Sequence, residues 1–262
     1  MESKLIYPLN YLPEAYVFLT PFDNCTAAAL ALEQTDYKED FCIAVDFDPF
    51  FIARLMAAGF LVMADTLYFD QDDESDDELD NDESVRDDSP NKIKTSKHIL
   101  LPKHHLTRSC LFFPELHVKK SIKKHLPLYD IYYDRDFDLV MDKCVEVHGD
   151  GWLTKPFLQA LREIRAEKDM PVRPVSFALY RDNRLVAGEF GIVSGRVYTS
   201  YSGYYEQSNA GTVQMILTAQ YLEQNGFHFW DLGMPLDYKL TIGAREISRG
   251  EFIKLFFKSN EP

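Results

Sequence analysis

The chain has 262 residues, 46% of them hydrophobic and 14% aromatic, which is typical of a folded globular protein and excludes a wholly disordered chain. It contains no run of 18 apolar residues and no basic N-terminal region followed by an apolar one, so we expect a cytoplasmic protein without a transmembrane helix or secretory signal. The four cysteines are widely spaced and form no CxxC pair, which favours reduced thiols over disulfides and predicts no metal site.

The net charge of −14 is concentrated in one segment. Residues 70–88 contain 12 acidic residues and one arginine, and removing their net −11 from the total leaves −3 for the rest of the chain. The overall charge therefore does not exclude a nucleic-acid partner. The low-complexity stretch 69–92 is predicted to be an acidic disordered insert. An inert linker, a regulatory tether and a competitor for the protein's own basic surface are three interpretations of it that stay open.

Several elements are predicted before and just after this insert. Residues 49–58 (PFFIARLMAA) read as a helix, with Asp48 as its N-cap and Gly59 just past its end. The segment HILLPKHHLTRSCLFFP, residues 98–114, suggests a short β-ribbon. LHVKKSIKKHL, residues 116–126, is predicted to be a short basic helix, and residues 137–149 have apolar side chains at helical spacing.

The second half of the chain alternates strand and helix signals. A helix is expected over 155–168, and residues 175–203 contain three strands joined by turns at Asp182-Asn183 and Ser194-Gly195. A helix over 209–227 closes at Asn225-Gly226, FHFWDLG is a buried strand, and FIKLFF (252–257) is expected to be the last strand. This order predicts an α+β, GNAT-like acyltransferase fold over 141–262, with a smaller N-terminal α/β subdomain over 1–140.

Four segments carry a resemblance to a known family. They are RSCLFFPELHVKKSIKK (108–124), WLTKPFLQAL (152–161), RLVAGEFGIVSGRVYTSYSG (184–203) and WDLGMPLDYKLTIGAREISRGEFIKLF (230–256). In this order they resemble the leucyl/phenylalanyl-tRNA–protein transferases, outside the acidic insert. The resemblance implies a monomeric enzyme that joins the amino acid of a charged tRNA to the N-terminal α-amine of an acceptor protein. Aminoacyl-tRNA is the co-substrate, and no other cofactor is implied.

The resemblance also implies roles for individual residues. A cationic strip would neutralise tRNA phosphates, and Trp152 would stack on the terminal adenosine, although a solvated helix face and a core tryptophan are the alternatives. Asp231, Ser200 and Tyr238 fall where catalytic groups are expected, with Tyr201 nearby. Ser200 replaces a family Glu, and Gly233 replaces a family Gln, so the site works differently or activity is lost. The strip comprises Arg108, Lys119, Lys120, Lys123 and Lys124.

Glu189 occupies a position that is apolar in the resembling family, where it lines the pocket for the transferred side chain. Ser202 matches a second pocket position. A carboxylate buried in an apolar pocket is costly unless it is paired, and a guanidinium pairs with it bidentately. We therefore predict that arginine is the transferred amino acid, added to acceptors with an acidic N-terminal residue and marking them for turnover through an N-degron pathway. In the alternative, Glu189 is structural and pairs with Arg184, Arg196 or Arg245, or faces solvent.

Two other function classes stay open. A GNAT acetyltransferase would need a pyrophosphate-binding turn, and the nearest candidate, Gln207 to Gly211, has the wrong spacing. A non-catalytic module that binds tRNA or N-termini is consistent with Ser200 and Gly233 in place of Glu and Gln.

Overall fold

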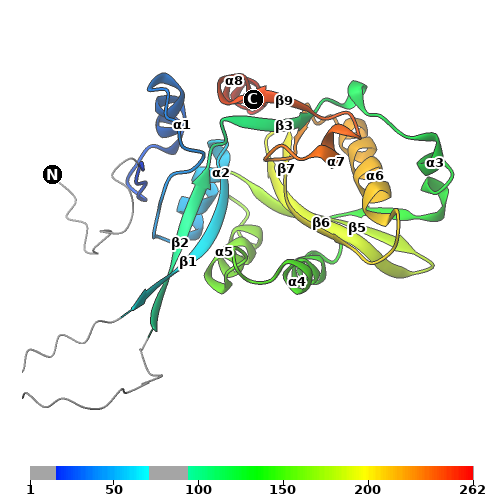
Figure 1. Ribbon diagram of the computed structural model, residues 1–262, viewed down its shortest axis with the longest axis horizontal. Coiled ribbons are helices and arrows are strands. Elements are labelled where there is room, and N and C mark those ends of the chain that lie inside the picture. Colours follow the sequence, from blue (N-terminus) through cyan, green and yellow to red (C-terminus); the bar gives the residue numbers. More distant parts are fainter. Residues whose placement is uncertain (1–15, 71–93, 262) are drawn as a thin grey trace, which may run out of the picture.

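The computed structural model describes residues 16–70 and 94–261, which form two sheets with helices around them (Figure 1). A two-stranded ribbon pairs β1 (Leu61–Asp70) with β2 (Lys94–Lys103). A seven-stranded sheet follows the order β4-β5-β6-β7-β8-β3-β9, in which only β7 and β8 run parallel. The expected α+β class is confirmed. The strands of the larger sheet are β3 (Thr107–Leu111), β4 (Asp130–Tyr133), β5 (Arg173–Arg181), β6 (Arg184–Ser194), β7 (Val197–Tyr205), β8 (Phe229–Asp231) and β9 (Arg245–Ser248).

The β5–β6–β7 meander forms where the turn residues predict it. Asp182 and Asn183 have φ angles of 50° and 60°, the left-handed values that a two-residue hairpin turn requires at both central positions. Gly195 has a φ of 52° at the second turn. Both predicted hairpins are therefore confirmed, and they place β6 at the centre of the meander, with Glu189 buried in it.

Helices cover both faces of this meander (Figure 1). On one face, Phe190 and Ile192 of β6 pack in a cluster with Met141 of α4 (Phe137–His148) and Phe157 of α5 (Lys155–Ala166). On the other face, Ala187 packs with residues of α6 (Ala210–Gln224). Successive side chains of a strand point to opposite faces, so alternate residues of β6 belong to these two layers. Three of the helices expected from the sequence, near residues 137, 155 and 210, are confirmed.

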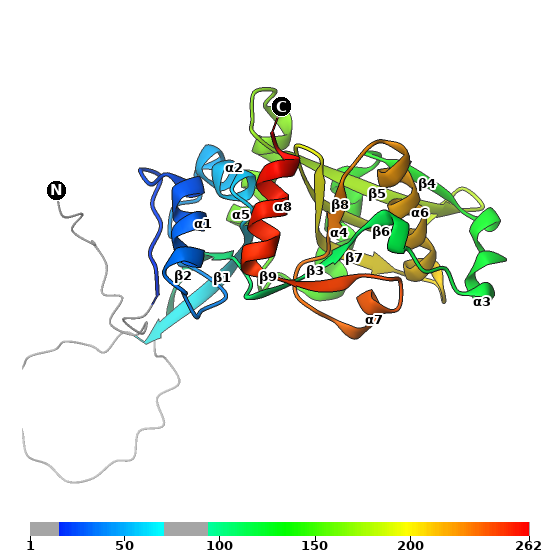
Figure 2. The same cartoon turned by 90° about the horizontal axis from the view of Figure 1, so that it is seen from above.

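The smaller part of the molecule lies against the larger sheet through helices. It contains α1 (Cys25–Gln34) and α2 (Pro49–Ala57), and α2 begins at Asp48, whose side chain accepts from the Phe51 N–H as predicted. In Figure 2, α8 (Arg249–Ser259) runs alongside α1 on one side and the end of the larger sheet on the other. Because β3 and β4 belong to the larger sheet, the predicted boundary at residue 140 cuts through that sheet.

Four local expectations need correction. FIKLFF is not a strand: it lies in α8, where the Ser248 hydroxyl caps the helix and Phe252, Ile253 and Phe256 are buried on one side. β2 and β3 do not pair with each other, since β2 pairs with β1 and β3 lies between β8 and β9. The predicted basic helix shrinks to the single turn α3 (Lys120–Lys123). The strand β1 extends to Asp70, one residue beyond the predicted start of the insert at 69.

The rest of that insert, residues 71–92, lies outside the described residues, as do the predictions made for it. Within the part that is described, no helix is long and apolar enough to cross a membrane.

Candidate active site

Glu189 lies on the face of the meander that α6 covers. The pairing of β6 with β7 places Glu189 opposite Gly203 and Gly191 opposite Ser200. Gly203 leaves room for the glutamate, because a Cβ at that position would lie 3.2 Å from the Cβ of Glu189. The Glu189 residue keeps only 6% of its surface exposed.

A directed chain of hydrogen bonds runs from Trp230 to Glu189. The indole Nε1–H of Trp230 donates to the Ser200 hydroxyl at 2.8 Å, and that hydroxyl donates to Oε2 of Glu189 at 3.2 Å. An indole nitrogen can only donate, so the serine accepts from it, and its own proton is free to bond to the carboxyl. Oε2 is the carboxyl oxygen that accepts from Ser200.

Oε1 has no hydrogen-bond partner among the described residues, and neither has the neighbouring hydroxyl of Tyr198. Burial raises the pKa of Glu189 to about 7, while the Ser200, Tyr198 and Gln214 side chains act in the opposite direction. No lysine or arginine of residues 16–70 and 94–261 forms an ion pair with Glu189: Arg245 pairs with Glu115, and Arg196 donates to the carbonyl of Gly226. The Glu189 carboxyl is thus buried with no cation of the described ranges paired to it, and the phenol of Tyr198, which can donate to a carboxylate oxygen, lies beside it.

The short helix α7 (Asp237–Leu240) brings two more groups near Glu189. Tyr238, predicted to be catalytic, is 52% exposed, and burial together with the Glu189 charge raises the pKa of its phenol. Lys239 was not identified from the sequence. Its ammonium donates to the carbonyls of Leu232 and Met234, and burial lowers its pKa to about 8, with Asp231 and Glu189 acting in the opposite direction. A lone lysine in a one-turn helix leaves no sequence signal of such burial.

Asp231, the last residue of β8, is also buried. Its oxygens accept from the Thr199 hydroxyl at 3.0 Å and from the Gly233 N–H at 2.9 Å, and Oδ1 lies 3.6 Å from Nε of Arg108. Asp231 and Arg108 are each 1% exposed. This geometry lets Asp231 hold the turn after β8, whereas a direct role in proton transfer stays a prediction.

Arg108 cannot belong to the exposed cationic strip, and this prediction is corrected. Its guanidinium donates to the carbonyl of Gly59 at 2.7 Å and lies 4.3 Å from the centre of the Phe252 ring. It therefore ties the smaller part of the molecule to the sheet.

Gly233, whose carbonyl accepts from the N–H of Ser109, has a φ of 75°. Glycine adopts this value without strain, so the backbone favours glycine at this position.

Tyr201 and Ser202 do not line the Glu189 site, and this prediction is also corrected. The β6–β7 pairing shifts register between Phe190 and Gly191, so Ser200 pairs with Gly191 while Ser202 pairs with Phe190 on the opposite face. The backbone carbonyl of Ser202 accepts from the thiol of Cys144 at 3.4 Å.

Two aromatic residues of the predicted site pack on that same opposite face. The Tyr201 hydroxyl accepts from the Val62 N–H at 2.9 Å, and its ring stacks against Phe157. Trp152 is partly buried against the same cluster. Stacking of Trp152 on a terminal base stays a prediction.

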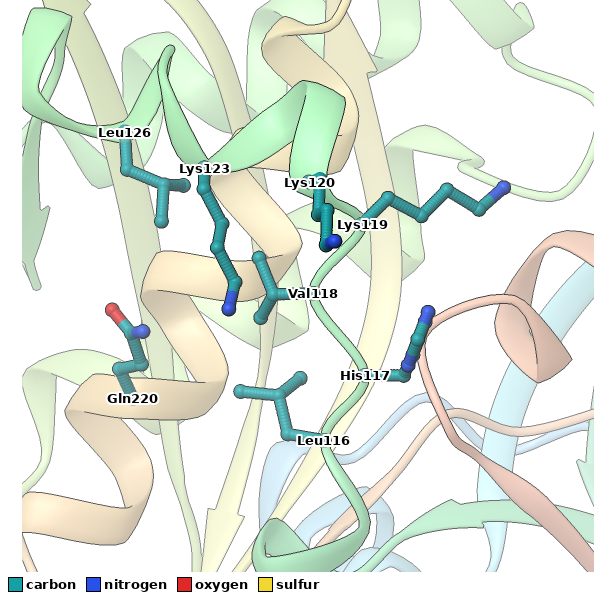
Figure 3. A pocket seen from close by; sticks show the side chains of 8 residues that line it. All are labelled: Leu116, His117, Val118, Lys119, Lys120, Lys123, Leu126 and Gln220. Carbon is teal, nitrogen blue, oxygen red and sulfur yellow. The ribbon is translucent and has the colours of Figure 1, made fainter.

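The four lysines of the predicted strip are exposed, and three of them border a pocket of about 870 Å³ (Figure 3). The segment that carries them is anchored where the His117 N–H donates to the carbonyl of Ile242 at 2.9 Å. Gly243 follows, and a Cβ there would lie 2.0 Å from the carbonyl oxygen of Glu115, so only glycine permits this approach. The lysines are Lys119, Lys120, Lys123 and Lys124. No group of three or more metal-ligating side chains occurs in the described ranges.

These features lie within the part of the chain that matches a known family. The model of the leucyl/phenylalanyl-tRNA protein transferase family matches residues 110–256, more than half of the chain, and the protein belongs to this family. Among curated relatives, the leucyl/phenylalanyl-tRNA–protein transferase of Pseudomonas aeruginosa is 32% identical over 152 residues, covering 55% of this chain and 65% of the relative. That of Flavobacterium johnsoniae is 28% identical over 154 residues, covering 56% and 71%.

The match thus spans slightly less than two thirds of the Pseudomonas relative's length. Among solved structures, the C-terminal domain of a candidate lysylphosphatidylglycerol synthetase from Agrobacterium fabrum aligns with a TM-score of 0.40 at 9% identity. This alignment covers 88% of this chain and 75% of that one.

Proposed function

We propose that the protein transfers the aminoacyl group of a charged tRNA to the N-terminal α-amine of an acceptor protein. Membership in the family supports the reaction type. The amine nitrogen attacks the ester carbonyl, the new C–N bond forms as the ester C–O bond breaks, and the amine proton passes to the departing ribose oxygen, which leaves as a hydroxyl. Because the ester is already activated, positioning of the two substrates can supply roughly 7–11 kcal/mol of barrier lowering.

We further propose that the transferred residue is arginine. One observation carries this step: the Glu189 carboxyl is buried, and no lysine or arginine among the described residues forms an ion pair with it. A guanidinium offers several N–H donors in one plane and can satisfy both oxygens at once. A leucyl or phenylalanyl side chain would leave the carboxyl unpaired in an apolar environment, which is unfavourable.

Other groups have supporting roles in this proposal. The exposed strip of Lys119, Lys120, Lys123 and Lys124 neutralises tRNA phosphates, a contact that positions the tRNA without reading its sequence. The acceptor carries an acidic N-terminal residue, in keeping with the use of arginine as the added residue, and the enzyme acts as a monomer.

The test offers the purified protein a panel of substrates. Peptides that begin with Asp, Glu, Ala or Lys are incubated with Arg-, Lys-, Leu- or Phe-tRNA, and the mass added to each peptide is read. We expect the mass of one arginine on acidic peptides and none on peptides with an acetylated N-terminus. Addition of leucine or phenylalanine instead would overturn the arginine assignment while keeping the reaction.

Two further outcomes would overturn the reaction itself. Acetylation in a parallel incubation with acetyl-CoA, without aminoacyl transfer, would favour the acetyltransferase. Binding of charged tRNA without transfer of any amino acid would favour the non-catalytic module.

A further inference from the structure

The pocket beside α3 combines positive charge with an apolar lining. His117 and three lysines border it, the apolar side chains of Leu116, Val118 and Leu126 contribute to its wall, and Gln220 enters from α6. The residues that line it include no carboxylate. In Figure 3, Lys123 and Gln220 extend over the same space near Leu116 and Val118, while Lys119 extends outward.

Neutralisation of phosphates requires neither a pocket nor an apolar lining. A row of exposed lysines on a convex surface would bind a phosphate backbone without any cavity. Here three lysines contribute to the lining of a pocket of about 870 Å³, large enough for a small-molecule ligand. Its apolar wall suits a flat uncharged body, and the Gln220 amide offers both a donor and an acceptor to the edge of that body.

We propose that this pocket binds one unpaired nucleotide of the tRNA. The base packs against Leu116, Val118 and Leu126, the Gln220 amide bonds to its edge, and Lys120 and Lys123 contact the flanking phosphates. Proteins recognise RNA most often through such splayed-out, unpaired bases. The inference rests on the proposed function for the identity of the RNA. Charge favours RNA over an acceptor peptide, because a peptide with one acidic residue would leave most of the lysines without an anion.

Short single-stranded RNA provides the probe. The affinity of the full-length protein is measured by fluorescence anisotropy for a tetranucleotide and for the same backbone with abasic sites, at two salt concentrations. We expect the intact RNA to bind about tenfold more tightly than the abasic one, because the abasic RNA loses both the apolar contacts and the hydrogen bond to Gln220. Equal affinities would overturn the proposal, as would displacement of the RNA by a short Asp/Glu-rich peptide at a lower concentration than by unlabelled RNA.

Two matched variants distinguish the contacts to the base from the contacts to the phosphates. Gln220→Ala should lower the preference for intact over abasic RNA, while Lys124→Gln, at an exposed lysine outside the pocket, should weaken both RNAs alike and reduce the salt dependence. An unchanged preference in Gln220→Ala would contradict the assignment of the amide. The wild-type comparison stands even if a variant fails to fold.

Failure of the pocket proposal and failure of the proposed transferase function give different results. Base-dependent binding that Gln220→Ala weakens, without aminoacyl transfer, would leave the pocket assigned and reject the transferase. Transfer with no preference for intact RNA would do the reverse.

Discussion

At the scale of single residues, burial of the Glu189 carboxyl makes folding stability depend on pH. The pKa of this carboxyl rises from an ordinary 4.5 to about 7. Between these values the folded protein keeps a proton that the unfolded chain has released, so the free energy of unfolding decreases as pH rises through this window and is level above it. Across this window the free energy of unfolding decreases by roughly 3 kcal/mol in total.

Glu189→Gln removes this dependence because an amide does not ionise. The free energy of unfolding of the variant, relative to the wild type, should rise by roughly 3 kcal/mol between pH 4.5 and pH 8. Urea denaturation at a series of pH values measures it. Glu223→Gln, the same change at an exposed position on α6, is the control and should show no trend. If the free energy of unfolding of Glu189→Gln relative to the wild type does not change with pH, burial does not raise the pKa of the carboxyl in the folded protein.

The Arg108–Asp231 pair gives a second prediction at this scale. Arg108→Met leaves Asp231 buried without its cation, and removal of one partner of a buried pair typically costs about 3–5 kcal/mol. Lys124→Met, at an exposed lysine, should change the free energy of unfolding by less than about 0.5 kcal/mol. Chemical denaturation of both variants is the measurement, and similar losses would argue against the buried pair.

At the scale of elements, α8 depends on its cap. The Ser248 hydroxyl accepts from the N–H of Glu251, and Ser248→Ala should lower the free energy of unfolding by about 1 kcal/mol. Ser208→Ala, at an exposed position just before α6, serves as the control and should have little effect in the same thermal or urea titration. A loss no larger than that of the control would show that the hydroxyl does not cap the helix.

Local signals account for the elements that the sequence predicts correctly. The turn residues Asp182 and Asn183 and the cap Asp48 act within four residues of the elements they define. FIKLFF was misread because a short apolar run fits a strand and a buried helix alike, and the capping serine lies outside it. The partners of β2 and β3 are set by distant parts of the chain, which no local pattern reports.

In the candidate site, too, some residues could be predicted from the sequence and others could not. Resemblance to the family singled out Glu189, Ser200 and Tyr238; in the structure the Ser200 hydroxyl donates to the Glu189 carboxyl, and burial together with the charge of that carboxyl raises the pKa of Tyr238. Tyr201 and Ser202 were misplaced because one register shift in a strand pair changes which side chains share a face. Lys239, Tyr198 and Gln214 were missed because their contacts with this site form only in the folded protein.

At the scale of the whole molecule, the lysine-bordered pocket and the Glu189 site are joined through the backbone. The His117 N–H bonds to Ile242, just after α7, which carries Tyr238 and Lys239. The smaller part of the molecule is held to the same sheet by the contact of Arg108 with Gly59. Both sites lie within residues 110–256, the segment that matches the family.

The most direct test of the account is a competition between charged tRNAs with the wild type and Glu189→Met. Arg-tRNA and Leu-tRNA are supplied together with one acidic peptide, and the products are counted by mass. We predict that the wild type adds arginine and that the ratio of arginine to leucine falls more than tenfold in the variant, because a hydrogen bond to a charged group contributes about 1.5–3 kcal/mol. A wild type that adds leucine, or an unchanged ratio in Glu189→Met, would contradict a cation-binding role for Glu189.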